Sequence, residues 1–158
     1  MTMNEEPWYQ QVAMPALLRH ARTAYGAAMR HALAEAGYDD VPPNGLYLIG
    51  GLALGKGEVV LGDLLRQLRL SKQSAGQLVD TLVVRGYLDR GIDPADSRKL
   101  NVTLTARGQA AAVVQGAARE MVDAELLAGV GPQDVERTRR TLAMLVDIAR
   151  RRGGGDDD

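Results

Sequence analysis

The sequence predicts a mainly helical protein with a small β wing (α+β), and three observations lead to this prediction. Two short helical patterns separated by a tight turn lie between Gly62 and Gly86. Two strand patterns around a polar loop follow them, in residues 87–104. Apolar residues with helical spacing occupy both flanks, in residues 8–54 and 105–152. A helix-turn-helix followed by a two-stranded hairpin is a winged helix, so residues 55–104 are expected to form a winged helix-turn-helix between helical flanks.

The two central helices are predicted from their apolar spacing. In the first, Leu64, Leu65 and Leu68 fall on one helical face. The second has apolar residues at the i, i+3, i+4, i+7 and i+8 positions, namely Ala75, Leu78, Val79, Leu82 and Val83. Ser71 is suited to cap the start of this second helix, and Gly86 to end it in the left-handed conformation.

The wing is predicted as two strands, 87–90 and 100–104, around a loop at 91–99. Residues 58–61 could add a brief third strand. In the flanks, Pro15 must start or kink a helix, so the first flank is one helix or a short helix followed by a long one. The expected segments are 8–36, a break at 42–44, a buried helix at 46–54, a long helix from Thr105 to about 127, a last helix from Pro132, and a flexible acidic tail at 153–158.

Composition excludes several classes of protein. The 158 residues contain no cysteine, which excludes disulfides, thiolate metal sites and thiol redox sensors. His20 and His31 lie 11 positions apart on one predicted helix, too far for one chain to chelate a metal with them, so no metal site is expected. No apolar run reaches membrane-spanning length, and a cytoplasmic protein without a membrane contact is the simplest interpretation. The formal net charge of −1 means that any nucleic-acid binding must depend on where charges are placed.

Two segments resemble the MarR family of bacterial transcription regulators. Residues 93–98 (Asp-Pro-Ala-Asp-Ser-Arg), followed by Leu104-Thr105 and Gly108, match the D-x-R…L-T…G signature of the family's wing. Residues 78–88 resemble its LVDxLxxxG segment. The resemblance implies a homodimer in which the terminal helices of two chains interdigitate. The wide apolar faces of these helices favour the same arrangement, because a single chain would cover them poorly. Met14, Met29, Met121 and Met144 are expected as core filler.

The predicted second helix is the expected DNA-reading element. With its apolar face in the core, it turns Lys72, Gln73, Ser74 and Gln77 outward, at the N-terminal turns where such helices contact base edges in the major groove. Glutamine matches adenine and lysine matches guanine at these edges. Ser71 and the free amides beside it suit a phosphate oxygen. The alternative is an ordinary solvated helix face.

In the wing, the resemblance implies that Arg98 reaches the DNA minor groove and that Asp96 organises it. Lys99 and Arg90 are expected as phosphate neighbours. The alternative for Asp96 and Arg98 is a loop ion pair of well under about 1 kcal/mol.

The resemblance also implies a small anionic aromatic ligand in the crevice between the dimer helices and the winged lobe. Tyr25, Met29 and Tyr47 belong to helices expected to meet there, with ordinary packing as the alternative. No cofactor is expected.

The function predicted is that of a homodimeric, sequence-specific regulator that binds double-stranded DNA. We expect a ligand-responsive repressor that recognises a pseudo-palindromic operator. The alternative is a winged helix used as a protein-interaction module. An enzyme is not expected, because the sequence has no catalytic triad, metal cluster or phosphate-binding loop; Gly50-Gly51 and Gly55-x-Gly57 lack the required spacing.

Overall fold

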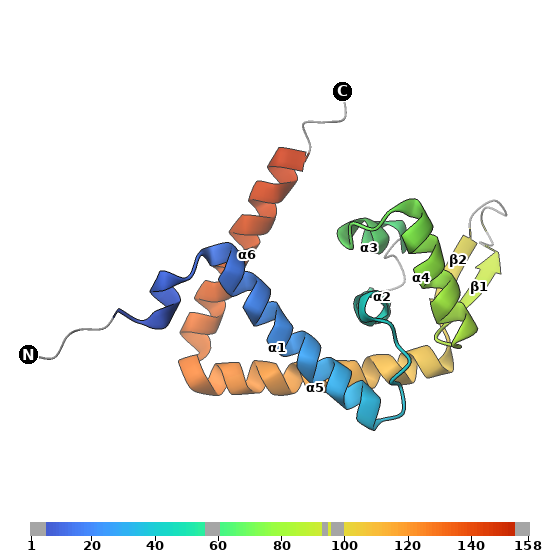
Figure 1. The fold of residues 1–158 in the computed structure, drawn as a ribbon, viewed down its shortest axis with the longest axis horizontal. Helices are drawn as coiled ribbons and strands as arrows, with labels where there is room; N and C mark the ends of the chain where they lie inside the picture. The colour runs from blue at the N-terminus through green and yellow to red at the C-terminus, as the bar shows by residue number, and fades with distance from the viewer. Residues whose placement is uncertain (1–5, 56–60, 93–94, 96–99, 154–158) are drawn as a thin grey trace, which may run out of the picture. The chain divides into compact units, whose positions relative to one another are not determined.

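The computed structural model describes residues 6–55, 61–92, 95 and 100–153, and these form the mainly helical fold with a two-stranded wing that the sequence predicts (Figure 1). The chain divides into two compact units, residues 1–119 and 120–158, which are described separately. In chain order the elements are η1 (Trp8–Gln11), α1 (Met14–Glu35), α2 (Pro43–Leu54), α3 (Leu61–Gln67), α4 (Lys72–Val84), β1 (Leu88–Ile92), β2 (Leu100–Leu104), α5 (Ala106–Val130) and α6 (Pro132–Gly153).

Helix α4 begins and ends where its sequence predicts. The hydroxyl oxygen of Ser71 accepts a hydrogen bond from the Ser74 amide at 3.1 Å, which caps the first turn. Gly86 follows the helix at φ 76°, and the Gly86 and Tyr87 amides donate to the carbonyls of Val83 and Leu82. This pair of hydrogen bonds is a Schellman motif, which ends α4 directly before the wing.

The strands form an antiparallel hairpin in which Leu88 lies opposite Leu104 and Ile92 opposite Leu100. The first strand therefore begins one residue later and ends two residues later than predicted. The predicted third strand was to include residues 58–60, which lie outside the described residues, and its last residue, Leu61, is instead the first residue of α3. The predicted acidic tail falls on residues 154–158, also outside the described part, apart from Gly153, which ends α6.

Helix α2 is the centre of the first unit, where it contacts α3, α4 and β2 (Figure 1). It begins at Pro43 rather than at Leu46, so the predicted break at 42–44 is wrong in part. A proline in the first turn needs no amide partner, and its fixed φ suits a helix start. The core of this unit combines side chains from α1, α2, α4, the hairpin and α5: Met29, Leu33, Leu46, Leu48, Ile49, Leu78, Val79, Leu82, Tyr87, Leu88, Val102, Ala111 and Ala118.

Helix α5 approaches the end of α4 so closely that a glycine is required. A Cβ atom on Gly108 would lie 2.1 Å from the Tyr87 carbonyl oxygen. Thr105 fixes this approach: its amide donates to the Tyr87 carbonyl at 3.1 Å, and its hydroxyl donates to the Gly86 carbonyl and accepts from the Gly108 amide. Thr105 thus caps α5, as predicted, and also binds α5 to the turn that precedes the wing.

A network of polar side chains surrounds Tyr87, whose side chain is fully buried. The Tyr87 hydroxyl donates to the Asp40 carboxylate, and the Arg107 guanidinium lies 3.2 Å from the same carboxylate and 3.1 Å from the hydroxyl. Burial of the ring, together with the bond to Asp40, raises the pKa of Tyr87 to about 12. The hydrogen bond from Tyr87 and the neighbouring Arg107 hold the pKa of Asp40 below its usual value.

The first flank is a short helix followed by a long one, the second of the two predicted alternatives, with Pro15 in the first turn of α1. In the second unit, α5 continues to Val130, and Gly131 at φ 82° separates it from α6. Large apolar side chains in this unit are exposed: Met121, Leu126, Leu127, Val130, Leu142, Met144, Leu145 and Val146. The prediction of methionine as core filler is right for Met29 but wrong for Met14, Met121 and Met144, which are exposed because no described segment covers them.

We expect Gly108→Ala to destabilise the protein by about 3 kcal/mol or more, since the added methyl group would collide with backbone rather than with a movable side chain. The matched control is Gly116→Ala in the same helix, where nothing lies within 4 Å of the new Cβ. That control should gain about 0.5–1 kcal/mol from helix propensity. Urea unfolding followed by circular dichroism measures both; similar free energies of unfolding for the two variants would disprove the close approach.

The stabilisation by Tyr87 should be lost between pH 10 and pH 12. The pKa of its phenol rises from 10.0 to about 12 in the folded protein, so the folded state holds the proton more tightly than the unfolded state does. This contribution is therefore complete below pH 10 and declines as the pH approaches 12. Because Tyr87→Phe has no phenol to ionise, the difference in unfolding free energy between wild type and variant should shrink over this range. A constant difference in urea titrations at stepped pH would contradict the assignment.

Candidate functional site

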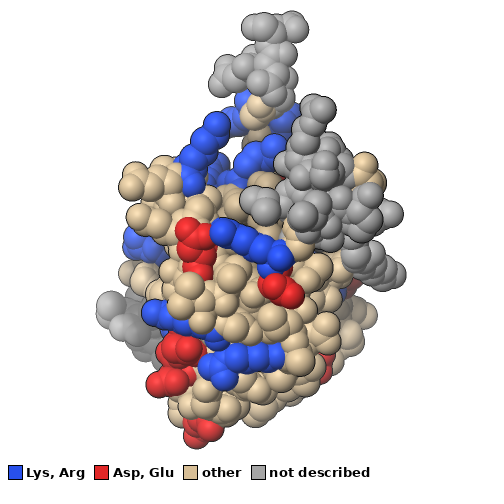
Figure 2. Space-filling view, turned by 90° about the vertical axis from the view of Figure 1, so that its right-hand side faces the viewer, with Lys and Arg blue, Asp and Glu red and all other residues tan. Residues whose placement is uncertain are grey.

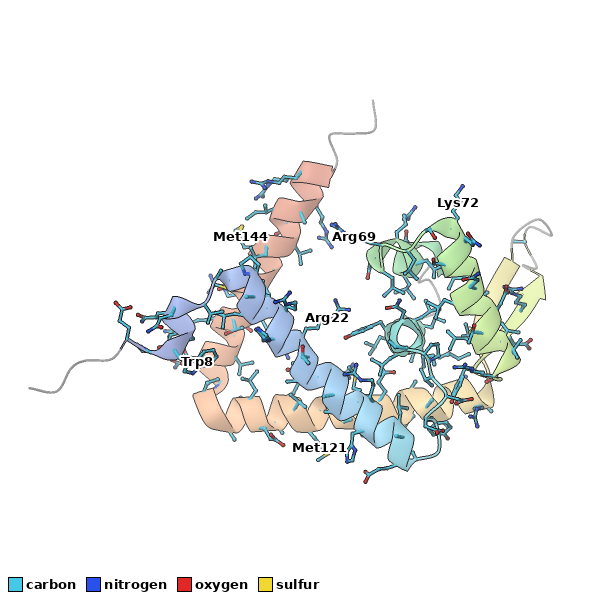
Figure 3. All side chains as sticks on the ribbon, viewed as in Figure 1. Trp8, Arg22, Arg69, Lys72, Met121 and Met144 are labelled. Carbon is cyan, nitrogen blue, oxygen red and sulfur yellow. The ribbon has the colours of Figure 1, made fainter. Side chains whose placement is uncertain are left out.

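The outward face of α4 carries the polar residues that the sequence assigned to it. Lys72, Gln73, Ser74 and Gln77 are exposed, whereas Leu78, Val79 and Leu82 of the same helix are buried in the core. Figure 3 shows Lys72 extending from the first turn of α4 away from the rest of the ribbon. The Ser71 hydroxyl, which caps the helix, also bonds to the Ser74 hydroxyl at 3.0 Å. The first two turns of α4 therefore present amide, hydroxyl and ammonium groups to solvent.

The turn between α3 and α4 adopts an uncommon backbone conformation. Arg69 has φ 52°, a left-handed conformation that residues other than glycine rarely adopt. The Arg69 amide donates to the Arg66 carbonyl at 3.0 Å, which closes the turn. This conformation could not be predicted from the sequence, because no glycine stands at the position.

Charged residues around α4 are partly neutralised by ion pairs. Arg90 of β1 pairs with Asp80 on α4, and Arg66 of α3 pairs with Asp63. Figure 2, which faces this side of the molecule, shows lysine and arginine side chains lying beside aspartate and glutamate side chains on a largely uncharged surface. One terminal nitrogen of Arg90 is bound to Asp80, and within the described residues its other donors have no further acceptor.

The wing candidates Asp96, Arg98 and Lys99 lie outside the described residues, in the segment of the chain between β1 and β2. Their predicted roles therefore stay predictions. The strands on either side of this segment are both present, and β1 is joined to α4 through the Arg90–Asp80 pair.

A cavity of about 290 Å³ lies among α1, α2 and α3. Its lining combines a cation, an aromatic ring, an amide and three leucines: Arg22, Tyr47, Leu48, Leu64, Gln67 and Leu68. The Arg22 guanidinium lies 4.4 Å from the centre of the Tyr47 ring, and its Nε donates to the Tyr47 hydroxyl at 3.2 Å. This stacked pair presents the remaining guanidinium donors beside an apolar wall, an arrangement that suits a flat molecule with an anionic group.

Of the three predicted crevice residues, Tyr47 lines this cavity. Met29 is part of the core and Tyr25 is half-buried against it. Sequence reasoning missed Arg22. A signal for it existed, because Arg22 precedes Met29 by 7 positions and therefore lies on the same face of α1. Its contact with Tyr47 could not be found that way, since the two residues are 25 positions apart.

The part of the chain that the structure describes contains no candidate metal site and no candidate membrane-spanning helix. No group of three histidine, aspartate or glutamate side chains there could hold a metal ion. None of the helices in the described part of the chain is long and apolar enough to cross a membrane.

Residues 39–99, which include α2, α3, α4 and β1, match the sequence model of the MarR family. No protein of curated function matches the sequence significantly.

Among solved structures, the fold is similar to that of a probable transcriptional regulator from Pseudomonas aeruginosa, at 25% identity and a TM-score of 0.64 over 86% of this chain and 98% of that one. It is also similar to MepR of S. aureus in a DNA complex, at 15% identity and a TM-score of 0.69 over 86% and 98% of the respective chains. A third similar structure is BpsR of Bordetella bronchiseptica, whose DNA binding is regulated by 6-hydroxynicotinic acid; the identity is 20% and the TM-score 0.65, over 90% and 99% of the two chains.

The MarR family consists of regulators rather than enzymes, which agrees with the absence of a catalytic motif in the sequence. The family match covers the helix-turn-helix, and the shared fold extends over most of the chain on either side of it. Residues 39–99 therefore match the MarR family in sequence, and the chain as a whole has the winged helix-turn-helix fold of these solved structures.

Proposed function

We propose that the protein is a homodimeric, ligand-responsive repressor that binds a pseudo-palindromic operator in the cytoplasm. The observation that carries this proposal is the exposed polar face on the first turns of α4, directly after a capped helix start. In a dimer, two such helices would enter successive major grooves roughly 34 Å apart, one turn of the duplex.

The exposed apolar residues of the second unit support the dimer. Leu127, Leu142, Leu145 and Val146 would remain in contact with water in a single chain. Soluble monomers rarely expose this many large apolar side chains in one unit, and a second copy of the same helices would cover them symmetrically.

The exposed polar residues in the first turns of α4 have proposed roles in reading DNA. Gln73 and Gln77 would pair with adenine edges, Lys72 with guanine, and Ser71 and Ser74 would contact a phosphate or base edge at the helix start. From the wing, Arg98 would enter the minor groove with Asp96 organising it, and Lys99 and Arg90 would contact phosphates.

The cavity beside Tyr47 is the proposed ligand site. Its volume of about 290 Å³ suits a single small ring compound, and Arg22 would bind the anionic group of that compound while the ring lies against the leucines. The regulation of BpsR by 6-hydroxynicotinic acid supports this class of ligand. Because Leu64, Gln67 and Leu68 belong to α3 or directly follow it, an occupant would press on the first helix of the helix-turn-helix.

We expect selection from a random pool of DNA duplexes to enrich a palindromic sequence. The affinity for that sequence should fall steeply when the salt concentration is raised, because the release of counterions from the phosphates then favours binding less.

Gln77→Ala should relax the preference for one base in each half-site, by about 1–3 kcal/mol if the glutamine pairs with that base through both amide atoms. Sequencing of the bound pools measures this preference.

Gln109→Ala is the matched control, because Gln109 is an exposed glutamine on α5 with no proposed DNA contact. An identical preference profile for wild type and Gln77→Ala would refute the assigned role. No enrichment from a protein that is a folded dimer by light scattering would favour the protein-interaction module instead.

Binding of 6-hydroxynicotinic acid tests the ligand site. Calorimetric titration should give a measurable dissociation constant for the wild type, weakened roughly tenfold or more in Arg22→Met, which removes a charge-assisted hydrogen bond. Arg19→Met, an equal change on an exposed face of α1, is the control. Equal affinities of the two variants would show that Arg22 is not the anchor. The acid should also release the selected duplex from the wild type.

A further inference from the structure

Asp40, in the loop after α1, contacts three other segments of the chain. Its carboxylate accepts from the Tyr87 hydroxyl and pairs with Arg107, and its backbone carbonyl accepts from Arg85. These partners lie 45 to 67 positions further along the chain. Arg85 caps the end of α4, Tyr87 directly precedes β1, and Arg107 is in the first turn of α5.

Aromatic rings reinforce the same junction. The Arg107 guanidinium lies 4.7 Å from the centre of the Tyr87 ring and 5.3 Å from that of Tyr38. The two rings meet edge to face at 6.2 Å. Arg107 therefore contacts the loop after α1 both through Tyr38 and through Asp40, so the start of α5 cannot turn relative to α4 without breaking several contacts together.

The exposure of the partners argues against a purely stabilising role. The side chains of Arg107 and Asp40 are 42% and 41% exposed, and ion pairs with that much solvent add little to stability. These contacts matter more for how the elements are oriented, because they lie where α4 ends, the wing begins and α5 starts.

We propose that Asp40 is a positioning residue for DNA binding, which fixes the angle between the winged lobe and the start of α5 and so sets the half-site spacing that two lobes of a dimer can bind together. This inference rests on the proposed operator binding. One lobe can meet one half-site at any angle, whereas two lobes joined through their helices meet both half-sites only when the angle is right.

The test compares two duplexes taken from the selected operator, one with both half-sites and one with a half-site scrambled, in anisotropy titrations of the full chain. Asp40→Asn should bind the intact operator about tenfold more weakly, within the range typical of coupled sites, and the single half-site nearly as well as the wild type does. In a series of operators with base pairs inserted between the half-sites, the affinity of Asp40→Asn should also vary less with the spacing than that of the wild type. Asp39→Asn, the same change at an exposed neighbour, should match the wild type in both.

An equal loss on both duplexes, or no loss on either, would overturn the inference. Arg107→Gln is measured in parallel, because its exposed side chain can be replaced without opening the core, and it should give the same pattern if Asp40→Asn fails to fold. If the wild type itself binds no duplex, the proposed operator binding fails and this inference fails with it.

Discussion

Tyr87 has no solvent-exposed surface, and each of its polar groups binds a different segment of the chain. Its amide closes α4 on the Leu82 carbonyl, its carbonyl accepts from Thr105 at the start of α5, and its hydroxyl donates to Asp40 in the loop after α1. A tyrosine is buried favourably only when its hydroxyl is hydrogen-bonded. The ring can therefore be buried only where these three segments meet, which determines how α4, the wing and the start of α5 lie together. The start of α5 can lie this close to Tyr87 only because residue 108 is a glycine.

The charge distribution explains why recognition in this regulator must depend on side-chain placement. The chain has a formal net charge of −1, and between Gly62 and Leu104 it carries seven basic and five acidic side chains. Ion pairs such as Arg90–Asp80 leave that small excess unchanged but occupy individual basic side chains. Weak general attraction to phosphates leaves more of the discrimination between sites to hydrogen bonds with base edges. The same pairs hold the wing and α4 together, so they also keep the proposed DNA-binding surface in shape.

Much of the candidate site follows from local sequence. The cap at Ser71 and the apolar period of α4 together determine that Gln73 and Gln77 face outward, because both signals act within two turns of one helix. The pairing of Arg22 with Tyr47 does not follow, since it depends on how α1 crosses α2. The roles of the wing residues, Arg98 above all, remain predictions from the family signature.

The sequence by itself determined the order of helices and strands, the ends of α4 at Ser71 and Gly86, and the hairpin, because each of these depends on residues within a few positions of one another. Only the tertiary structure decided which face of α5 is buried in the first unit: it is the face of Ala111, Gln115 and Ala118, whereas Val113 is 72% exposed. Gln115 is buried because its amide donates to the Leu46 carbonyl of α2 at 2.8 Å, and Gly50 leaves room for it. The spacing of apolar residues is a property of one helix alone. Which face of that helix is buried depends on the shape and the polar groups of the element packed against it.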